Sequence, residues 1–226
     1  MEKQNPIKLS AVVISFNEED KISICIDSLS EVADEIIVVD SLSTDRTVEI
    51  CTSMGATVIS QSFLGYIEQK NFALGQTSHD YVLSIDADEV LSDELKKSII
   101  EIKNNCKYAA YKFNRLTNYC GKWIKHGGWY PDSKLRLWKK DLGQWGGTNP
   151  HDTVIVDKDT KIGKLNGDLL HYSIDSIHQH IDQIQRFTTI AANAMYSNGR
   201  KATIINILFN PLFKFVRDYI LRFGFL

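Results

Sequence analysis

Three carboxylates stand close together at Asp86, Asp88 and Glu89, directly after an apolar run that begins at Tyr81. Carboxylates this close repel one another unless a positive charge neutralises them or water surrounds them. A divalent metal that holds a phosphorylated substrate is one explanation, because Mg²⁺ and Mn²⁺ prefer oxygen ligands and share them with phosphates. A solvated turn that begins a helix is the other, since acids favour the positive end of a helix dipole.

The residues around these acids alternate between two patterns. Short apolar runs rich in β-branched residues predict buried strands over 9–16, 35–40, 56–60 and 81–88. Apolar residues at helical spacing predict helices over 17–30, 43–55 and 65–75, and one more after Ser92. This alternation predicts an α/β fold with right-handed crossovers and a parallel, doubly wound sheet.

Single residues predict where some of these helices begin and end. Ser43 or Thr44 is expected to cap the second helix and Ser92 the fourth, while Gly55 is expected to stop the second. Acids at 18–20 would occupy the first turn of the first helix.

Polar clusters follow three of the predicted strands, over 15–19, 40–45 and 86–89. Ligands of such sheets bind beyond the carboxyl ends of the strands, so these clusters are expected to gather at one edge and form a site. No GxGxxG or GxxxxGK[ST] motif is present, which disfavours dinucleotide and P-loop phosphate binding. A bound diphosphate would then need another counter-charge, which a metal on Asp86 and Asp88 could supply.

Bulk properties exclude several classes of protein. The chain has 226 residues and a net charge of -2, which gives no electrostatic case for a nucleic-acid partner. Its four cysteines form no CxxC pair, which argues against structural zinc and a disulfide framework and favours free thiols in a reducing compartment. The N-terminus lacks a long apolar run, so we expect no signal peptide and a cytoplasmic location.

Four motifs carry a resemblance to a known family: VVISFNEED, EIIVVDSLSTDRT, QKNFAL and LSIDADE. In order and spacing they resemble the nucleotide-sugar half of inverting family-two glycosyltransferases, which have the GT-A fold. In the second half, GGWYPDSKLRLW, WGGTNPHDTV and LLHYS resemble the bacterial β-1,4-glucosyltransferase subgroup that adds a hexose to lipopolysaccharide inner core. The resemblance covers nearly the whole chain.

This resemblance implies a metal-dependent hexosyltransferase that uses Mn²⁺ or Mg²⁺. UDP-glucose is the expected donor, and lipopolysaccharide core or another lipid-linked glycan is the expected acceptor. A capsule or other surface glycan with a different donor sugar is the alternative.

The resemblance also implies roles for single residues. The turn of Phe16, Asn17 and Glu18 would edge the nucleotide, with Glu18 as the side-chain contact. Asp40 would hold the base or ribose, and Asp45 would support its loop. The family's Asp-Asp-Gly-Ser turn reads Asp-Ser-Leu-Ser here, which removes an acid and a glycine from that loop.

The remaining donor-side roles concern charge. Lys70 would lie near the nucleotide or a site acid, Asp86 would face the ribose and metal, and Asp88 would ligate the metal. His171 fits the late histidine that GT-A proteins bring to the metal, although a lone histidine after an apolar run is more often structural.

Inverting transfer needs a base for the acceptor hydroxyl. His151 and Asp152 follow a glycine pair where backbone can approach a ligand, and Asp152 is the predicted base, with Asp132 as second candidate. The competing interpretation is a surface turn, because the Asn-Pro pair before them favours one. Arg136 lies between apolar residues and would bind a diphosphate or acceptor phosphate if inward, or face solvent on an edge strand.

Other second-half residues are weaker candidates. His126 precedes two glycines and could line the acceptor cleft. Trp123, Trp129, Trp138 and Trp145 are close in sequence, and one or two of them are expected to touch sugar while the others build core.

The predicted organisation has three parts. Residues 1–105 form the nucleotide-sugar half, 106–180 the acceptor half of the same domain, and 181–226 a helical region. From about residue 203, bulky apolar residues alternate with Lys214, Arg217 and Arg222, so a spanning helix is not expected. A basic amphipathic helix on anionic lipid is favoured over packing against the domain or a second copy.

Two other functions fit part of this pattern. A nucleotidyltransferase shares the sheet and the paired acids, but its glycine-rich basic signature is missing after the first strand. A non-catalytic sugar- or lipid-binding module would not need both the acid cluster and the acceptor-side His-Asp pair.

Overall fold

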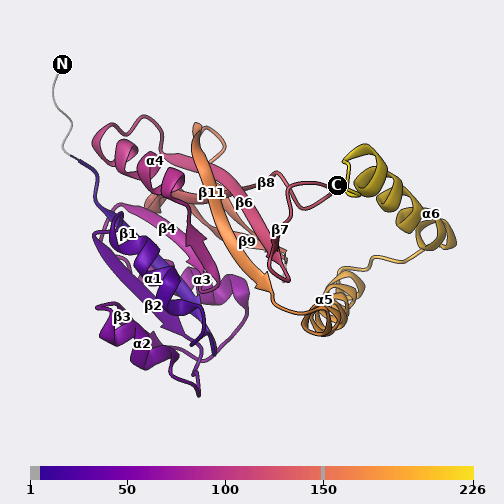
Figure 1. Ribbon diagram of the computed structural model, residues 1–226, viewed down its shortest axis with the longest axis horizontal. Helices are drawn as coiled ribbons and strands as arrows, with labels where there is room; N and C mark the ends of the chain where they lie inside the picture. The colour runs from indigo at the N-terminus through magenta and orange to yellow at the C-terminus, as the bar shows by residue number, and fades with distance from the viewer. Residues whose placement is uncertain (1–5, 149–150) are drawn as a thin grey trace.

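The computed structural model describes residues 6–148 and 151–226 (Figure 1). The first part contains β1 (Leu9–Ser15), α1 (Ile22–Ser30), β2 (Glu35–Asp40), α2 (Thr47–Ser53), β3 (Thr57–Ser60), α3 (Tyr66–Gly75) and β4 (Tyr81–Asp86). There follow β5 (Glu89–Leu91), α4 (Asp93–Asn104), β6 (Ala110–Tyr119), β7 (Lys122–Trp123), β8 (Asp132–Lys139), a short 3₁₀ helix (Lys140–Leu142), β9 (Gly143–Thr148), β10 (His151–Val156) and β11 (Ile162–Ile174). The chain continues through α5 (Ile177–Ser197), α6 (Ile204–Phe215) and a π-helical turn (Val216–Leu221).

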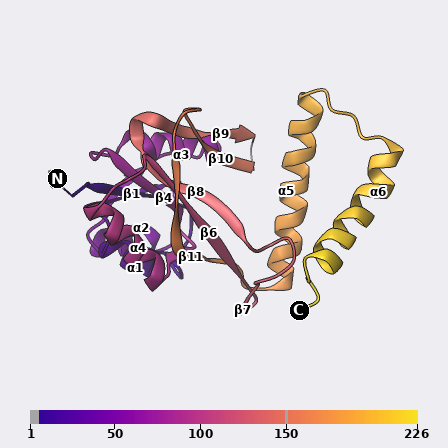
Figure 2. The same cartoon turned by 90° about the horizontal axis from the view of Figure 1, so that it is seen from above.

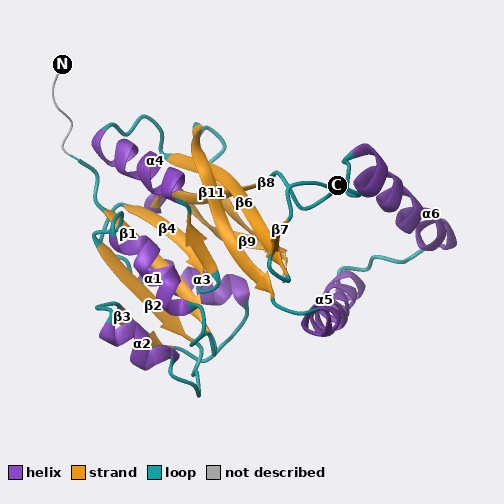
Figure 3. Ribbon diagram, in the orientation of Figure 1, coloured by secondary structure: helices purple, strands orange, loops and turns teal. Residues whose placement is uncertain are grey.

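The main sheet runs in the order β3-β2-β1-β4-β8-β6-β11-β5, with β7 paired to β6 (Figure 3). β1 pairs in parallel with β2 and β4, and β2 with β3, which confirms the predicted α/β fold. Beyond β4 the sheet is mixed, because β8 is antiparallel to both β4 and β6, and β11 is parallel to β6. β9 and β10 form a separate antiparallel ribbon.

β1, β2 and β4 are buried on both faces over most of their length, as their continuous apolar runs predict. Alternate residues of β1 enter two core clusters, with Leu9, Ala11 and Val13 on one side and Val12 on the other. The first cluster includes α1 and α4, and the second includes α3 and the ring of Trp138. The carboxyl ends of β1, β2 and β4 therefore have a rigid support on both sides.

Two helix starts differ from the prediction. α1 begins at Ile22 rather than at 17, so the acids at 18–20 precede it, and α2 begins at Thr47 without a side-chain cap. Ser43 and Thr44 do not cap α2, because they bond instead to the turn after β1. Asn17 sits in the left-handed region at φ 53° and joins the two loops through these bonds. Ser43 and Thr44, which could have capped α2, thus link the loops that follow β1 and β2.

The fourth helix begins as predicted. Ser92 caps α4 by accepting a hydrogen bond from the Leu95 amide, and its hydroxyl also accepts one from the Asp168 amide of β11. β5 and β11 then pair with His171 opposite Glu89, and the Tyr172 amide donates to the Asp88 carbonyl at 2.9 Å. β5 was not predicted as a strand, yet this pairing places His171 beside the acid cluster.

The C-terminal helices lie beside the sheet and off its end, as two views at right angles agree (Figures 1 and 2). α6 runs through Pro211 rather than being interrupted there, and most of its large apolar side chains are exposed. Within the described residues, no helix is long and apolar enough to cross a bilayer.

Gly167 supplies a test of how β11 fits against α4. It has φ +90°, and a Cβ there would lie 2.7 Å from Leu95 Cα and nearer still to the Leu95 amide nitrogen. We expect Gly167→Ala to lower the free energy of unfolding by about 2 kcal/mol or more, because backbone must move. Gly55 has φ +83° with nothing within 4 Å, so Gly55→Ala should cost only about 1 kcal/mol of backbone strain. Urea unfolding of both variants measures the difference, and equal losses would contradict the steric explanation.

Candidate active site

A cavity of about 1720 Å³ opens beyond the carboxyl ends of β1, β2 and β4. Residues from all three predicted polar clusters line it, including Ser15, Glu18, Ser41, Asp86 and Asp88. The expectation that these strand ends gather is therefore confirmed. Asp132, Asp152 and His171 line the same cavity from the second half of the chain. It exceeds the roughly 300–1,000 Å³ of ordinary small-molecule pockets, which leaves room for two substrates.

The loops after β1 and β2 are tied together by polar bonds. Asp40 is buried and accepts hydrogen bonds from the Ser15 hydroxyl at 3.0 Å and from the Ser43 amide at 2.8 Å. Asp45 accepts bonds from the Glu19 and Thr47 amides, which matches its predicted supporting role. Asp40 does not line the cavity, so its geometry fits a loop support, and its base or ribose contact stays a prediction.

Phe16 and Asn17, the first two residues of the predicted turn, are placed differently. Phe16 is 57% exposed and lines the cavity, where its ring is available to a ligand. Asn17 is not on the cavity wall, and its side chain accepts from the Thr44 amide at 2.8 Å. Asn17 therefore shapes the loop.

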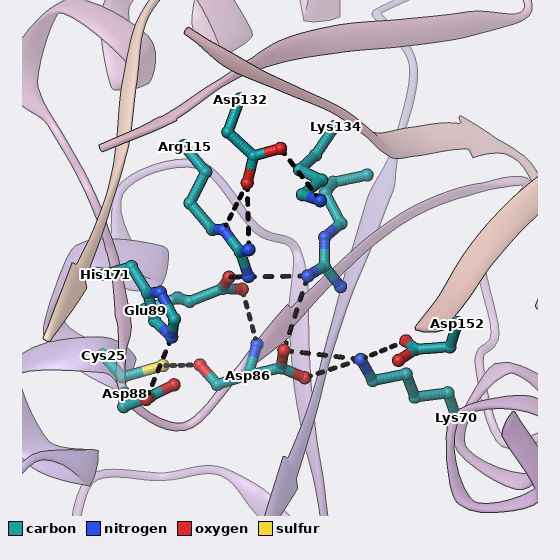
Figure 4. Close-up of polar contacts among 11 residues, drawn as sticks. Cys25, Lys70, Asp86, Asp88, Glu89, Arg115, Asp132, Lys134, Asp152 and His171 are labelled. Carbon is teal, nitrogen blue, oxygen red and sulfur yellow. Dashed lines mark hydrogen bonds and ion pairs between the residues drawn. The ribbon is translucent and has the colours of Figure 1, made fainter. Parts of the chain in front are cut away.

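Lys70 joins the two halves of the site (Figure 4). It extends from α3, is 3% exposed, and its Nζ lies 3.0 Å from Asp86 Oδ1 and 2.7 Å from Asp152 Oδ2. Its Nζ also lies 4.3 Å from the ring centre of Trp145. A buried ammonium is costly unless charges compensate it, so these two carboxylates and the ring hold Lys70 in place.

Arg136 points inward, which resolves the alternative left open by its sequence. It is 4% exposed, and its Nη2 lies 3.4 Å from both Asp86 Oδ2 and Glu89 Oε1. Burial alone would raise the pKa of Asp86, but the charges of Lys70 and Arg136 outweigh it and hold that pKa well below its usual range. Burial would likewise lower the pKa of Arg136, and Glu89 and Asp86 raise it instead. Both groups are charged at neutral pH.

Asp132 is held more completely than Asp152. Its Oδ2 lies 2.9 Å from Arg115 Nη2, and its Oδ1 lies 3.0 Å from Lys134 Nζ. Among the residues that the structure describes, the second oxygen of Asp152 has no hydrogen-bond or ion-pair partner. Asp152 lies on β10; the Asn-Pro turn predicted just before that strand falls at 149–150, outside the described residues.

The sequence did not predict that Glu89, Arg115, Lys134 and Trp145 belong to this network. Glu89 is fully buried and accepts from the Asp86 amide at 2.9 Å, while Arg115 lies between Glu89 and Asp132. Trp145 packs beneath Lys70 and Arg136. Glu89 was visible as part of the acid run, but nothing in the sequence brings Arg115 to it, because they meet through the strand order.

A second group of charged side chains, in which the charges are less balanced, consists of Asp88, His171 and Glu18. Asp88 Oδ2 lies 3.2 Å from His171 Nε2, so an oxygen and a nitrogen ligand converge. Burial and then the negative charge of Asp88 raise the pKa of Glu18 to about 7. The inner network carries four acids and four bases: Asp86, Glu89, Asp132, Asp152, Lys70, Arg115, Lys134 and Arg136. Asp88 and Glu18 lie outside this balanced network, and the negative charge of Asp88 contributes to the raised pKa of Glu18.

Several side chains of these two groups and of Trp145 have a buried polar atom without a hydrogen-bond partner among the described residues. Within the described chain, Arg136 Nη1, Trp145 Nε1 and His171 Nδ1 are buried without hydrogen-bond partners. Native proteins leave few such atoms, and those that remain call for water, an ion or a ligand. These atoms are available to hydrogen-bond to water or to a ligand.

The residues fit a divalent cation only in part. Asp88 and His171 offer ligands of the right kind, and Mg²⁺ often needs just one or two carboxylates when substrate phosphates supply the rest. Asp86 is occupied by Lys70 and Arg136, and no group of three His, Cys, Asp or Glu among the described residues is arranged to hold a metal alone. Asp86, Asp88 and His171 therefore remain predicted metal ligands. The structure brings Asp88 and His171 within 3.2 Å of each other.

Relatives of this chain are glycosyltransferases by name. An uncharacterised glycosyltransferase of Rickettsia typhi is 36% identical over 233 residues, which cover 96% of this chain and 80% of the relative. The lipopolysaccharide core biosynthesis glycosyltransferase LpsC of Rhizobium meliloti is 28% identical over 94% of this chain and 81% of its own length.

Solved structures agree at the level of fold. Glucosyl-3-phosphoglycerate synthase of Mycobacterium tuberculosis, crystallised with Mn²⁺, UDP and glucosyl-3-phosphoglycerate, has a TM-score of 0.58 at 20% identity and covers 87% of this chain and 82% of its own. TarS of S. aureus with UDP-GlcNAc has a TM-score of 0.55 at 16% identity and covers 77% and 61%. The profile of glycosyl transferase family 2 matches residues 10–158. The chain has the GT-A fold and belongs to glycosyl transferase family 2.

Proposed function

We propose that this chain is an inverting hexosyltransferase that moves glucose from UDP-glucose to a lipopolysaccharide core or another lipid-linked glycan. The similarity to LpsC supports the acceptor class, and neighbours crystallised with UDP or UDP-GlcNAc support a uridine donor. The observation that carries the proposal is the charge pattern, in which a balanced network around Lys70 and a second pair of acids, Asp88 and Glu18, line one cavity.

Each part of this pattern has a place in the proposed reaction. Asp88 and His171 would hold Mn²⁺ or Mg²⁺, which supplies Lewis-acid stabilisation of the leaving diphosphate when bound. Glu18 and Phe16 would contact the nucleotide. The ion pair of Lys70 and Asp86 would lie between the donor and the acceptor. In this arrangement residues 1–105 bind the donor and residues 106–180 the acceptor.

Asp152 is the proposed base. It faces the cavity, Lys70 fixes one oxygen, and the other oxygen is available to take the acceptor proton. Asp132 is the weaker candidate, because Arg115 and Lys134 engage both of its oxygens. Loss of the hydroxyl proton to Asp152 would accompany attack on the anomeric carbon from the face opposite the diphosphate, which inverts the configuration.

The C-terminal segment is proposed to lie on the cytoplasmic face of the membrane. Leu208, Leu212 and Phe213 are 64%, 58% and 65% exposed on α6. Lys214 and Arg222 flank this apolar surface, which suits anionic lipid. A lipid-linked acceptor would lie at the membrane surface, so membrane binding by the tail is consistent with the proposed acceptor.

Product analysis separates this function from the nucleotidyltransferase alternative. Incubation with UDP-glucose, Mn²⁺ and rough-type lipopolysaccharide should release UDP and extend the glycan by one hexose. Release of pyrophosphate from UTP and glucose-1-phosphate would establish the alternative instead. Tight binding of UDP-glucose with neither product would indicate a binding module.

Replacing Asp88 tests the metal role. We expect Asp88→Asn to lower the rate of glucose transfer by about 100-fold or more, because loss of a metal ligand removes several kcal/mol of transition-state stabilisation. Mn²⁺ binding in the presence of UDP, followed by electron paramagnetic resonance, should weaken in parallel. Asp93→Asn is the matched control, since that side chain is 91% exposed at the start of α4. Undiminished activity of Asp88→Asn would exclude the metal role.

Replacing Asp152 tests the base. We expect Asp152→Asn to lower kcat by about 100- to 10,000-fold, the usual contribution of general base catalysis. The KM for UDP-glucose should change little, because Asp86 still holds Lys70. Asp132→Asn provides the comparison, and a larger loss of kcat there would transfer the assignment to Asp132.

Vesicle co-sedimentation tests the tail. The chain should bind vesicles that contain phosphatidylglycerol more tightly than those of phosphatidylcholine alone, and salt should weaken that binding. Leu208→Gln combined with Leu212→Gln should reduce the bound fraction, while Ile24→Gln on α1, 43% exposed, should not. Self-association without lipid binding would favour a second copy as the tail's partner.

A further inference from the structure

Three rings line the cavity on the side away from the nucleotide-binding strands. Tyr119 ends β6, Trp129 precedes β8, and His180 lies near the start of α5. The centroid of Tyr119 is 5.9 Å from that of Trp129 and 5.3 Å from that of His180, with planes at 80° and 81°. Tyr119 Oη and His180 Nδ1 are 3.1 Å apart, within hydrogen-bond distance. These three residues are called the aromatic cluster below.

Within the aromatic cluster, Trp129 is exposed, unlike the two tryptophans of the core. Trp129 is 38% exposed, whereas Trp138 and Trp145 are 0% and 3% exposed and pack in the core. Edge-to-face contacts fix the rings without stacking them, so a flat apolar ligand can still pack against the exposed ring of Trp129. A large exposed aromatic in a cavity wall is a feature of binding sites rather than of packing.

The loop that carries Trp129 is fastened to the C-terminal segment. The Gly127 amide donates to the Arg222 carbonyl at 2.9 Å. A Cβ at Gly128 would lie 2.9 Å from a carboxylate oxygen of Asp218, so the loop and the tail fit closely there. The rings are therefore preorganised between the catalytic domain and the exposed apolar helices, which lowers the entropic cost of binding.

The position of the aromatic cluster relates it to the charged network. Arg115 and Tyr119 lie on the same strand, four residues apart, which corresponds to on the order of 13 Å. Both line the same cavity, which Asp132 and Asp152 of the charged network and Lys214 of the C-terminal segment also line. A glycan held by lipid near the tail would pass the aromatic cluster before its reactive hydroxyl reached Asp152.

We propose that the aromatic cluster is an acceptor subsite that binds a pyranose ring distant from the reacting hydroxyl. This inference rests on the proposed function and names the part of the acceptor that is recognised. The C–H face of a pyranose can pack against the electron-rich face of Trp129, and the polar atoms of Tyr119 and His180 can bond its hydroxyls. The ligand class is the oligosaccharide portion of the acceptor, independent of its lipid.

The test uses lipid-free core oligosaccharide released from rough-type lipopolysaccharide by mild acid. Trp129→Ala should raise the KM for this oligosaccharide about fivefold or more, the scale of one aromatic contact, and Trp129→Phe should restore most of the loss. The KM for UDP-glucose should change by less than about twofold in the same variant, which a general structural defect would not allow. Trp123→Ala is the matched control, because Trp123 packs against Tyr172 and is not on the cavity wall.

Saturation-transfer NMR and a variant of a second cluster residue, His180, complete the experiment. Sugar protons of the oligosaccharide should receive saturation from the wild-type chain and lose it in His180→Ala, which serves if Trp129→Ala does not fold. An unchanged oligosaccharide KM in both variants, or no saturation transfer from the wild type, would overturn the inference. Failure of the proposed function is distinct, because the wild type would then release no UDP from UDP-glucose.

Discussion

The site depends on one buried ammonium group. Lys70 takes a carboxylate from each half of the chain, Asp86 from β4 and Asp152 from β10, and the ring of Trp145 covers it. Without the charge of Lys70, Asp86 and Asp152 would repel each other. A buried lysine without these carboxylates would also be energetically costly. β4 and the β9–β10 ribbon are thus held together by mutual neutralisation as well as by apolar packing.

Local sequence patterns were sufficient for the first half of the fold. The strands at 9–15, 35–40, 57–60 and 81–86 were found because continuous apolar runs and turn residues identify buried parallel strands. The start of α2 was missed because Ser43 bonds to Asn17 across two loops, and a cap cannot be distinguished from such a bond by sequence. Single-residue signals worked where the partner is local, as at Ser92, and failed where it is distant.

The same distinction applies to the site. Asp86, Asp88 and Asp152 line the cavity as expected, since strand ends and glycine-flanked turns show in the sequence. Arg115 was missed because its role arises from the strand order β4-β8-β6, which places it beside Glu89. Trp145 was missed because its ring reaches Lys70 and Arg136 from the separate β9–β10 ribbon. Arg136 was noticed as an unusual charge, but only the structure shows that its anions belong to the protein itself.

The β9–β10 ribbon has a further consequence. Asn71 of α3 bonds both the amide and the carbonyl of Trp145, each at 2.9 Å, so the ribbon that carries Asp152 is held against α3. These two bonds involve no residue of β7 or α5, so the position of the ribbon does not depend on those segments. Substitutions in β7 and α5 can therefore accumulate without displacing Asp152, which leaves these outer segments open to sequence divergence.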